Sequence, residues 1–291
     1  MQLIDGKKTS KEIREEIAEE VKEMTASEKR TPKLVAVLVG NDGASRTYVN
    51  AKSKACEKVG FGTETLHFEE SMTQDELLKE VEKLNNDDEV DGFIVQVPLP
   101  KHIDEDVILQ AINPKKDVDG FHPTNIGRMT LGLPTYLPAT PAGIVELLKR
   151  YNIETSGKNC VVIGRSNIVG TPVSILLSRK TEGGNSTVTL CHSRTADIKA
   201  HTLQADIIIV AIGKKHFLTE DMVKDGAVIV DVGIHREEKE NGVKLYGDVD
   251  FENVAPKCSY ITPVPGGVGP MTIVSLLQNT LLAAKGEIYK K

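Results

Sequence analysis

CVVIGRSNIVGTP, residues 160–172, is an apolar run that leads directly into a glycine-containing turn. The part from Val161 to Ile163 is uninterrupted and β-branched, as expected of a strand buried on both faces of a parallel sheet. A helix is predicted to follow Gly170. Strand, glycine turn and helix in this order bring backbone N–H groups and a helix N-terminus to one point, which suits a pyrophosphate.

The turn departs from the usual G-x-G-x-x-G fingerprint. Ser166 replaces the middle glycine, and the last glycine comes one residue late. Taken alone, the motif is therefore also compatible with a tight strand-to-helix turn that binds nothing.

The end of the next predicted strand, residues 187–191, bears on the choice of cofactor. NAD-binding folds usually place an acid there to bind the ribose 2′-hydroxyl, but this strand runs into His192-Ser193-Arg194-Thr195. A hydroxyl and a guanidinium suit a 2′-phosphate, and Arg165 is a second candidate cation. We therefore expect NADP rather than NAD. The alternatives remain that Arg194 is a solvated loop charge and that His192 is only a polar strand end.

Strands alternate with helices elsewhere in the chain. In the first half, the apolar run 34–40 precedes a helix from Ser45 to Val59, and strands over 63–68 and 90–97 flank a helix capped by Thr73. Thr9 and Glu12 have the spacing of a capping box for an earlier helix, and Thr140 precedes Pro141 as a candidate cap. In the second half, further strands are predicted over residues 187–191, 207–212, 228–232 and 259–262.

This pattern predicts two α/β domains with parallel sheets, the second of the Rossmann type, with a cleft between them. We expect residues 1–139 to form a catalytic domain that a C-terminal helix, 271–291, completes, and residues 140–270 to form the nucleotide-binding domain. Residues 113–141 hold many prolines and glycines and no clear period, which predicts a long irregular connection.

Composition excludes several classes of protein. The 291 residues carry 36 Lys and Arg against 42 Asp and Glu, and aromatic residues make up 4% with no Trp, so neither a nucleic-acid backbone nor stacked bases are expected partners. No apolar run reaches the length of a membrane span, and the acidic N-terminal region does not resemble a signal or transit peptide. The four cysteines are too dispersed for a metal site or a disulfide framework. We expect a soluble cytoplasmic protein without a metal.

Tyr48 and Lys52 are the first candidate catalytic residues. They are four residues apart and so share a face of the helix that follows a predicted parallel strand. A lysine near a ligand is a usable proton carrier. Spacing alone favours the simpler interpretation of a solvated helix lysine, because Lys54 and Lys58 lie nearby. Gln96 interrupts the apolar strand 93–97, so it is either part of a buried hydrogen-bond network or a site residue.

Two acids punctuate the irregular connection, in Lys116-Asp117-Val118-Asp119-Gly120. Either carboxylate is able to receive hydrogen bonds from a ligand's N–H groups. Acidic residues before glycine are also ordinary turn formers, so the pattern leaves both roles open.

The chain resembles one family along nearly its whole length: the bifunctional methylenetetrahydrofolate dehydrogenase/methenyltetrahydrofolate cyclohydrolases. The most specific matches are residues 95–100 (VQVPLP) and 263–272 (PVPGGVGPMT), and the unusual turn with Ser166 is the family's own version. Residues 45–52, 116–120, 192–195, 231–234 and 247–250 also match.

The resemblance implies two reactions. NADP takes a hydride from 5,10-methylenetetrahydrofolate, and the methenyl product is hydrolysed to 10-formyltetrahydrofolate. Lys52, Gln96 and Tyr48 are then the catalytic residues, with Lys52 as proton carrier and Tyr48 against the folate ring. The implied folate contacts are Tyr48, Lys52, Gln96, Asp119, Pro265, Gly266 and Gly267. The implied cofactor contacts are Gly164, Arg165, Ser166, Ile168, Ser193, Arg194, Thr195 and Ile234. The resemblance also implies a homodimer through the nucleotide domain.

Two positions depart from the family. Ala139 stands where many members have Cys, which excludes a thiol role there, and His235 stands where many have Asn. Two other interpretations compete with a bifunctional enzyme: another NAD(P)-dependent dehydrogenase with a single activity, and a catalytically silent nucleotide-binding module. Tyr48-x-x-x-Lys52 also has the spacing of short-chain dehydrogenases, but there the nucleotide motif precedes the pair, whereas here it follows by more than a hundred residues.

Overall fold

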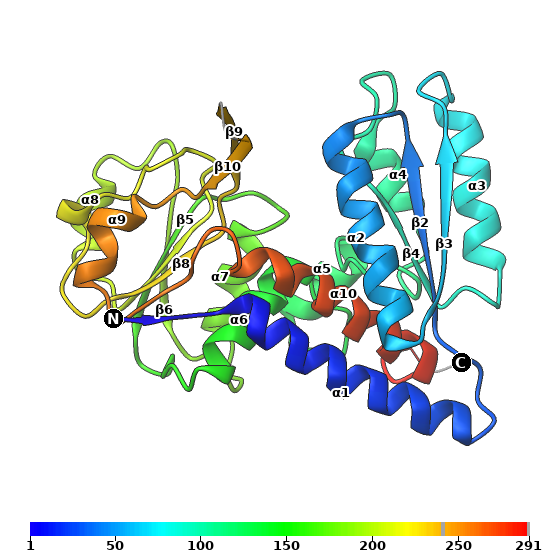
Figure 1. Cartoon of the computed structure of the whole chain (residues 1–291), viewed down its shortest axis with the longest axis horizontal. Coiled ribbons are helices and arrows are strands. Elements are labelled where there is room, and N and C mark those ends of the chain that lie inside the picture. Colours follow the sequence, from blue (N-terminus) through cyan, green and yellow to red (C-terminus); the bar gives the residue numbers. More distant parts are fainter. Residues whose placement is uncertain (240–241, 290–291) are drawn as a thin grey trace. The chain divides into compact units, whose positions relative to one another are not determined.

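The computed structural model describes residues 1–239 and 242–289, and these divide into two compact units (Figure 1). Unit 1 comprises Met1–Lys11 and Thr140–Thr272, and unit 2 comprises Glu12–Ala139 and Ile273–Lys291. The boundaries fall inside the first helix, α1 (Gly6–Ala26), inside the last, α10 (Val268–Lys285), and at the start of α6 (Ala139–Arg150). Both units therefore draw on separate parts of the sequence.

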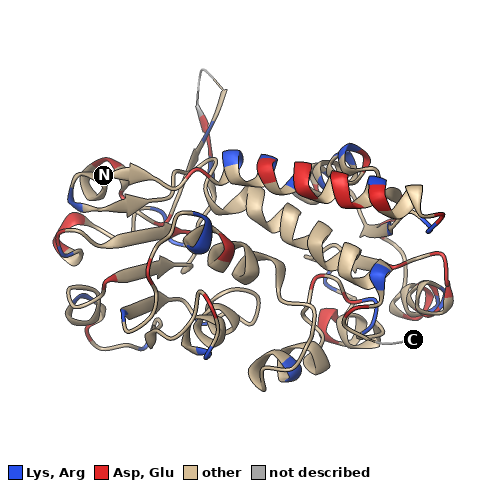
Figure 2. Cartoon of the chain, turned by 90° about the horizontal axis from the view of Figure 1, so that it is seen from below, with Lys and Arg blue, Asp and Glu red and all other residues tan. Residues whose placement is uncertain are grey.

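Unit 2 is built on a parallel sheet in the order β3-β2-β4, with bounds Gly62–Phe68, Lys33–Val39 and Gly92–Val95. Alternate residues of β2 pack into a buried core with the apolar faces of α3 (Gln74–Asn86) and α4 (Glu105–Ala111). Helix α1 buries an apolar stripe of Ile13, Ile17, Val21 and Met24, and charged residues follow the rest of the helix (Figure 2). Burying both faces of β2 explains its unbroken apolar run.

Unit 1 holds a parallel sheet whose described strands follow the order β1-β11-β8-β7-β5-β6. Their bounds are Gln2–Leu3, Tyr260–Ile261, Val228–Asp231, Ile207–Val210, Asn159–Ile163 and Thr187–Cys191. The helices are α6, α7 (Gly170–Ser178), α8 (Ile198–Thr202) and the short α9 (Phe251–Val254), and two single-turn 3₁₀ helices span Glu220–Met222 and Ala255–Lys257. An antiparallel hairpin of β9 (His235–Lys239) and β10 (Gly242–Tyr246) leaves the end of β8.

Each of the two parallel sheets has a topological switch point, where strand order reverses. In unit 1, β5 lies between β6 and β7, and in unit 2, β2 lies between β3 and β4, so successive strands are added to opposite sides of the first. Ligands of open parallel sheets bind at the carboxyl ends of the strands at such switch points. Gly164 follows β5 at the first point, and Gln96 follows β4 at the second.

The predicted α/β class with parallel sheets is confirmed, and so are the cap by Thr73, which forms a capping box with Glu76, and the helix end at Val59. Gly60 closes that helix in a left-handed conformation. The other two predicted caps are wrong. Thr9 lies inside α1, where Asp5 accepts the Lys8 N–H instead, and Thr140 lies inside α6 and bonds Thr272. Both helices begin earlier than their hydroxyl residues suggested.

The irregular connection contains a helix that the apolar period did not reveal, α5 (Pro123–Thr130). Its first turn is capped by the His122 ring, which accepts the Thr124 N–H, and Pro123 occupies the start, where its missing N–H is no loss. Within the described residues no helix is long and apolar enough to cross a membrane.

Candidate active site

Lys52 and Gln96 meet in unit 2. Lys52 lies on α2 (Gly43–Val59), which Asp42 caps by accepting the Ser45 N–H, and only 9% of its surface is exposed. Its Nζ donates to Gln96 Oε1 at 3.1 Å, and Gln96 Nε2 donates to the Val97 carbonyl at 2.6 Å. The structure therefore buries this lysine, unlike the solvated residue that its spacing favoured, and Gln96 belongs to a hydrogen-bond network at the end of β4.

The two acids of the 116–120 stretch have different surroundings. Buried Asp117 accepts hydrogen bonds from the backbone N–H groups of Gly120, Phe121 and His122 and from Asn125 Nδ2. Its carboxylate thus shapes the loop. Burial raises its pKa, while these hydrogen bonds act to lower it. Asp117 is the turn former that the sequence left open.

Asp119 is half-buried, and its carboxylate has no hydrogen bond to any residue that the structure describes. Loss of solvation raises the pKa of this carboxyl, and the charge of Lys52 acts in the opposite direction. The Lys52 ammonium and the Asp119 carboxylate, which come from different segments, are therefore near enough to interact electrostatically. Both carboxylate oxygens are left for a ligand.

Tyr48 lies one helical turn before Lys52 on α2, and 44% of it is exposed. An exposed aromatic ring beside a buried ammonium is a suitable stacking surface for a planar ligand. Among the described residues, no group of three or more His, Cys, Asp or Glu side chains is arranged to hold a metal ion.

The nucleotide turn of unit 1 needs its two glycines for close backbone contact. Gly164 has a φ of +118°, and a Cβ there would lie 2.0 Å from the Ala211 carbonyl oxygen. A Cβ on Gly170 would lie 1.9 Å from the Gly164 carbonyl oxygen. Ser166, which replaces the middle glycine of the general motif, accepts the Val169 N–H at 3.1 Å and so orders the start of α7.

Arginines stand at the ends of two neighbouring strands. Arg165 follows β5 and Arg194 follows β6, both are exposed, and neither guanidinium has a hydrogen-bond or ion-pair partner within the described residues. Thr195 Oγ1 accepts the His192 N–H, and His192 Nδ1 accepts the Arg194 N–H, so these two side chains hold the turn. The adjacent Ser193 is exposed as well. Two free guanidiniums beside a hydroxyl fit a phosphate.

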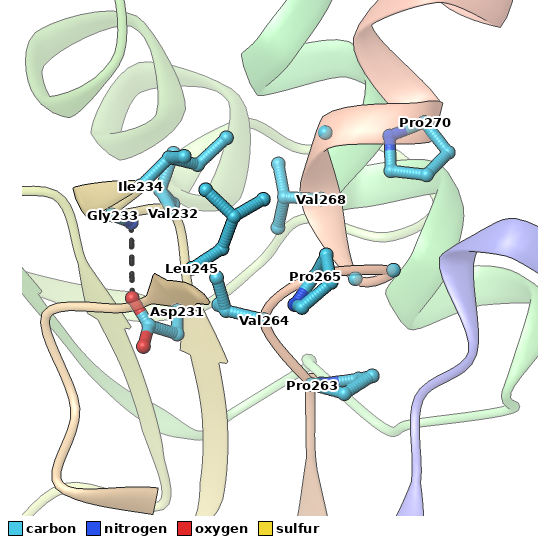
Figure 3. Close-up of a pocket in the computed structure, with 13 residues that line it drawn as sticks. Asp231, Val232, Gly233, Ile234, Leu245, Pro263, Val264, Pro265, Val268 and Pro270 are labelled. Carbon is cyan, nitrogen blue, oxygen red and sulfur yellow. Dashed lines mark hydrogen bonds between the residues drawn. The ribbon is translucent and has the colours of Figure 1, made fainter. Parts of the chain in front are cut away.

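A pocket lies at the same edge of the unit 1 sheet (Figure 3). Residues 231–234 form one wall, residues 263–270 form the other, and Leu245 comes from β10. The predicted residues Ile234, Pro265, Gly266 and Gly267 all line it. Lys7 N–H donates to the Gly266 carbonyl, so the first turn of α1 holds this loop. Ile168 is exposed but does not line the pocket.

The pocket's loops are joined by a pair of buried carboxylates, those of Asp231 and Asp248, whose role no sequence motif had indicated. Asp231 accepts the N–H groups of Gly233, Asp248 and Val249, and Asp248 accepts those of Ile212 and Gly213. Burial and the neighbouring Asp248 raise the pKa of Asp231 to about 6. The glycines near both acids were the available signal, since a Cβ at Gly233 or Gly247 would meet a carboxylate.

His235, the residue that departs from the family, belongs to this network. Its Nε2 lies 2.7 Å from Asp248 Oδ1. The side chain thus ties the first residue of β9 to the buried acid that holds the loop after β7. An Asn at this position has a donor as well, which gives the substitution a simple structural basis.

Comparison with known proteins gives two family matches. Residues 4–119 match the catalytic domain of tetrahydrofolate dehydrogenase/cyclohydrolase, and residues 138–288 match its NAD(P)-binding domain. The bifunctional protein FolD of Bacteroides thetaiotaomicron is 59% identical, with all of both chains covered.

Solved structures agree with these matches. The bifunctional enzyme FolD of Campylobacter jejuni, a methylenetetrahydrofolate dehydrogenase/cyclohydrolase, is 50% identical with a TM-score of 0.93 over 99% of each chain. The corresponding Trypanosoma brucei enzyme, solved with NADP and an inhibitor, is 36% identical with a TM-score of 0.92, covering 99% of this chain and 98% of that one.

Proposed function

The chain belongs to the tetrahydrofolate dehydrogenase/cyclohydrolase family, and on this premise we propose that Lys52 is its proton carrier, held by Gln96. The enzyme catalyses two reactions. It oxidises 5,10-methylenetetrahydrofolate to the methenyl form with NADP, and it hydrolyses the methenyl form to 10-formyltetrahydrofolate. The contact between Lys52 Nζ and Gln96 Oε1, at 3.1 Å, is the observation that carries the proposal.

The two reactions place different demands on the protein. Loss of a hydride beside a nitrogen gives a cation stabilised by that nitrogen, so the first reaction depends on positioning more than on a base. In the second reaction a water oxygen bonds to the cationic carbon, a carbon–nitrogen bond breaks, and the departing nitrogen gains a proton. That step needs a group that moves protons.

Lys52 meets this need in unit 2. We propose that its amine takes a proton from the attacking water and delivers one to the departing nitrogen. Gln96 orients the amine through its Oε1. Asp119 receives hydrogen bonds from the pterin ring, and Tyr48 packs against that ring. These roles follow the family resemblance and agree with the surroundings of the residues.

The residues at the β5 turn fit NADP. The glycines at 164 and 170 leave no room for a side chain because a Cβ would meet the backbone of Ala211 or Gly164, which keeps the turn tight between β5 and the N-terminus of α7. Arg165 and Arg194 have no partner among the described residues. We propose that these residues, with Ser166, Ile168, Ser193, Thr195 and Ile234, hold the cofactor, which accepts the hydride when bound. Pro265, Gly266 and Gly267 are proposed folate contacts. Residues 1–139 with 271–291, and 140–270, are the proposed catalytic and nucleotide-binding domains.

Lys52→Met tests the proposal when each reaction is assayed separately. We expect methenyl hydrolysis to fall by a factor of roughly 100 or more, in the range of lost acid–base catalysis, and hydride transfer to fall far less. Lys54→Met, an exposed lysine on the same helix, is the matched control and should leave both rates unchanged. Equal losses in both assays would contradict the role of Lys52, and absence of both activities in the unmodified protein would favour a silent module.

We also propose that the enzyme is a homodimer and lies in the cytoplasm. The homodimer follows from the family resemblance, and β6 has a hydrogen-bonded neighbour on one side only within the described sheet. The four cysteines are free and buried, as suits a reducing compartment. Sedimentation equilibrium of the purified protein measures the first point, and cell fractionation the second.

A further inference from the structure

The Asp119 loop is held by residues near the C-terminus, and we propose that Asn279 and Tyr289 are positioning residues for the Asp119 carboxylate. The inference rests on the proposed role of Asp119 in binding the pterin. All the residues concerned belong to unit 2, although about 160 positions separate the loop from its tethers.

The Asp119 carboxylate needs support from the backbone because, in the part of the chain that the structure describes, no hydrogen bond to its own side chain holds it in place. Its carboxylate makes no hydrogen bond to any described residue, so its direction depends on how firmly the backbone around it is fixed. A binding group that is fixed before the ligand arrives loses less conformational freedom on binding. Backbone tethers achieve this while leaving both carboxylate oxygens available.

Asn279 supplies the first tether from α10. Its Nδ2 donates to the Val118 carbonyl and to the Leu137 carbonyl, each at 2.8 Å, and only 6% of the residue is exposed. One amide therefore joins the peptide bond between Val118 and Asp119 to a second segment of chain. The Ala139 N–H completes the connection by donating to the Asp119 carbonyl at 3.3 Å.

Close packing transmits the position of that second segment to the loop. Gly120 has a φ of +76°, and a Cβ on it would lie 2.6 Å from the Leu137 carbonyl carbon. The backbones of Gly120 and Leu137 are thus in direct contact, with no space for a side chain between them. A shift at Leu137 would have to move Gly120, the neighbour of Asp119.

Tyr289 supplies the second tether. Its Oη donates to Asn125 Oδ1 at 2.6 Å, and Asn125 Nδ2 donates to Asp117 Oδ2 at 2.7 Å. Asp117 in turn accepts the N–H groups of the residues that follow Asp119, beginning with Gly120. The Arg128 guanidinium lies 5.0 Å from the centre of the Tyr289 ring and helps to hold it.

These contacts are more specific than packing of the C-terminal segment requires. Asn125 is fully buried, and its side chain joins Tyr289, Thr135 and Asp117. An apolar side chain would fill the site of Asn279 equally well but would leave the Val118 and Leu137 carbonyls without a donor. The polar groups converge on the peptide bonds on both sides of Asp119, which is the arrangement expected of a support for a binding residue.

The test is a double-mutant cycle on the full-length enzyme. Tyr289→Phe removes one hydroxyl, and we expect it to raise the KM for methylenetetrahydrofolate by roughly three- to tenfold, the effect of one lost hydrogen bond, with the KM for NADP unchanged. Asn279→Leu should raise the folate KM by roughly tenfold or more. In an Asp119→Asn background, Tyr289→Phe should produce no further rise. Tyr260→Phe, in β11 of unit 1, is the matched control.

The outcomes separate this inference from the proposed function. An unchanged folate KM in Asp119→Asn overturns the pterin contact and the inference with it. A raised folate KM in Asp119→Asn with an unchanged one in Tyr289→Phe overturns the inference alone. So does a rise by the same factor in the Asp119→Asn background, or an equal rise in the KM for NADP, because a merely structural effect would act without regard to Asp119.

Discussion

At the scale of single residues, the environment decides what chemistry a side chain performs. Asp117 and Asp119 are two positions apart, yet one carboxylate is consumed by four hydrogen bonds and the other has none. The sequence identified both as candidates but did not separate them, because the bonds to Asp117 come from backbone groups that any sequence supplies. Lys52 was ambiguous for a similar reason, since its burial depends on the chain around Gln96.

Asp231 predicts a pH dependence of stability. Its pKa is raised from 3.8 to about 6 in the folded enzyme, so between these values the folded state binds more protons than the unfolded state. Stability should therefore fall as the pH rises from about 4 to 6, by up to about 3 kcal/mol from this group.

Urea unfolding across that pH range measures the effect, and Asp231→Asn isolates it, because the amide does not titrate. The variant should be less stable throughout, since an NH2 group replaces one of the two oxygens that together accept three backbone N–H groups. Its stability should nevertheless change less between pH 4 and 6 than that of the unmodified enzyme. Identical slopes for the two proteins would show that Asp231 titrates normally.

Arg194 is predicted to select NADP over NAD. Its guanidinium is exposed and has no protein partner among the described residues, so a 2′-phosphate would be its ion pair. Arg194→Ala should raise the KM for NADP by roughly tenfold or more, as expected for a lost hydrogen bond to a charged group, and change the KM for NAD little. Steady-state kinetics with both cofactors measures this. If the KM values for NADP and NAD rise by the same factor, Arg194 has a role in the fold of the loop instead.

At the scale of elements, local sequence patterns predicted most strands and helices. They failed for elements that are defined by tertiary contacts. The unbroken apolar runs of β2, β5, β7 and β8 reflect burial on both faces, which the sequence records directly. Strand β1 has two residues and is defined only by its pairing with β11. Helix α5 has a buried Asn and an exposed Gly in place of an apolar stripe, so periodicity did not reveal it.

The first residue of α7, Gly170, has no room for even one methyl group. In Gly170→Ala the new Cβ would lie 1.9 Å from the Gly164 carbonyl oxygen, so we expect a loss of about 2 kcal/mol or more in unfolding free energy, together with weakened NADP binding. Gly127→Ala in α5 is the matched control. Its Cβ meets no atom within 4 Å, so helix propensity should stabilise the enzyme by about 0.5–1 kcal/mol. Equal effects of the two variants in urea unfolding would contradict this account.

At the scale of the whole molecule, both ends of the chain support loops that lie far away in the sequence. The first residues add β1 to the sheet of unit 1 and support the loop at Gly266, whereas the last residues join unit 2 and hold the Asp119 loop. The family resemblance implied which residues we propose as contacts of folate and NADP. It did not reveal these supports, because they depend on contacts between distant segments that no motif encodes.

The Lys52 amine is proposed to move a proton in hydrolysis and not to be needed for hydride transfer. The most direct measurement is the ratio of products when Lys52→Met turns over methylenetetrahydrofolate with excess NADP. We expect that NADPH forms and that methenyltetrahydrofolate accumulates, whereas the unmodified enzyme and Lys54→Met release mainly 10-formyltetrahydrofolate. Lys52→Met that yields the normal proportion of 10-formyltetrahydrofolate, at whatever overall rate, would contradict it.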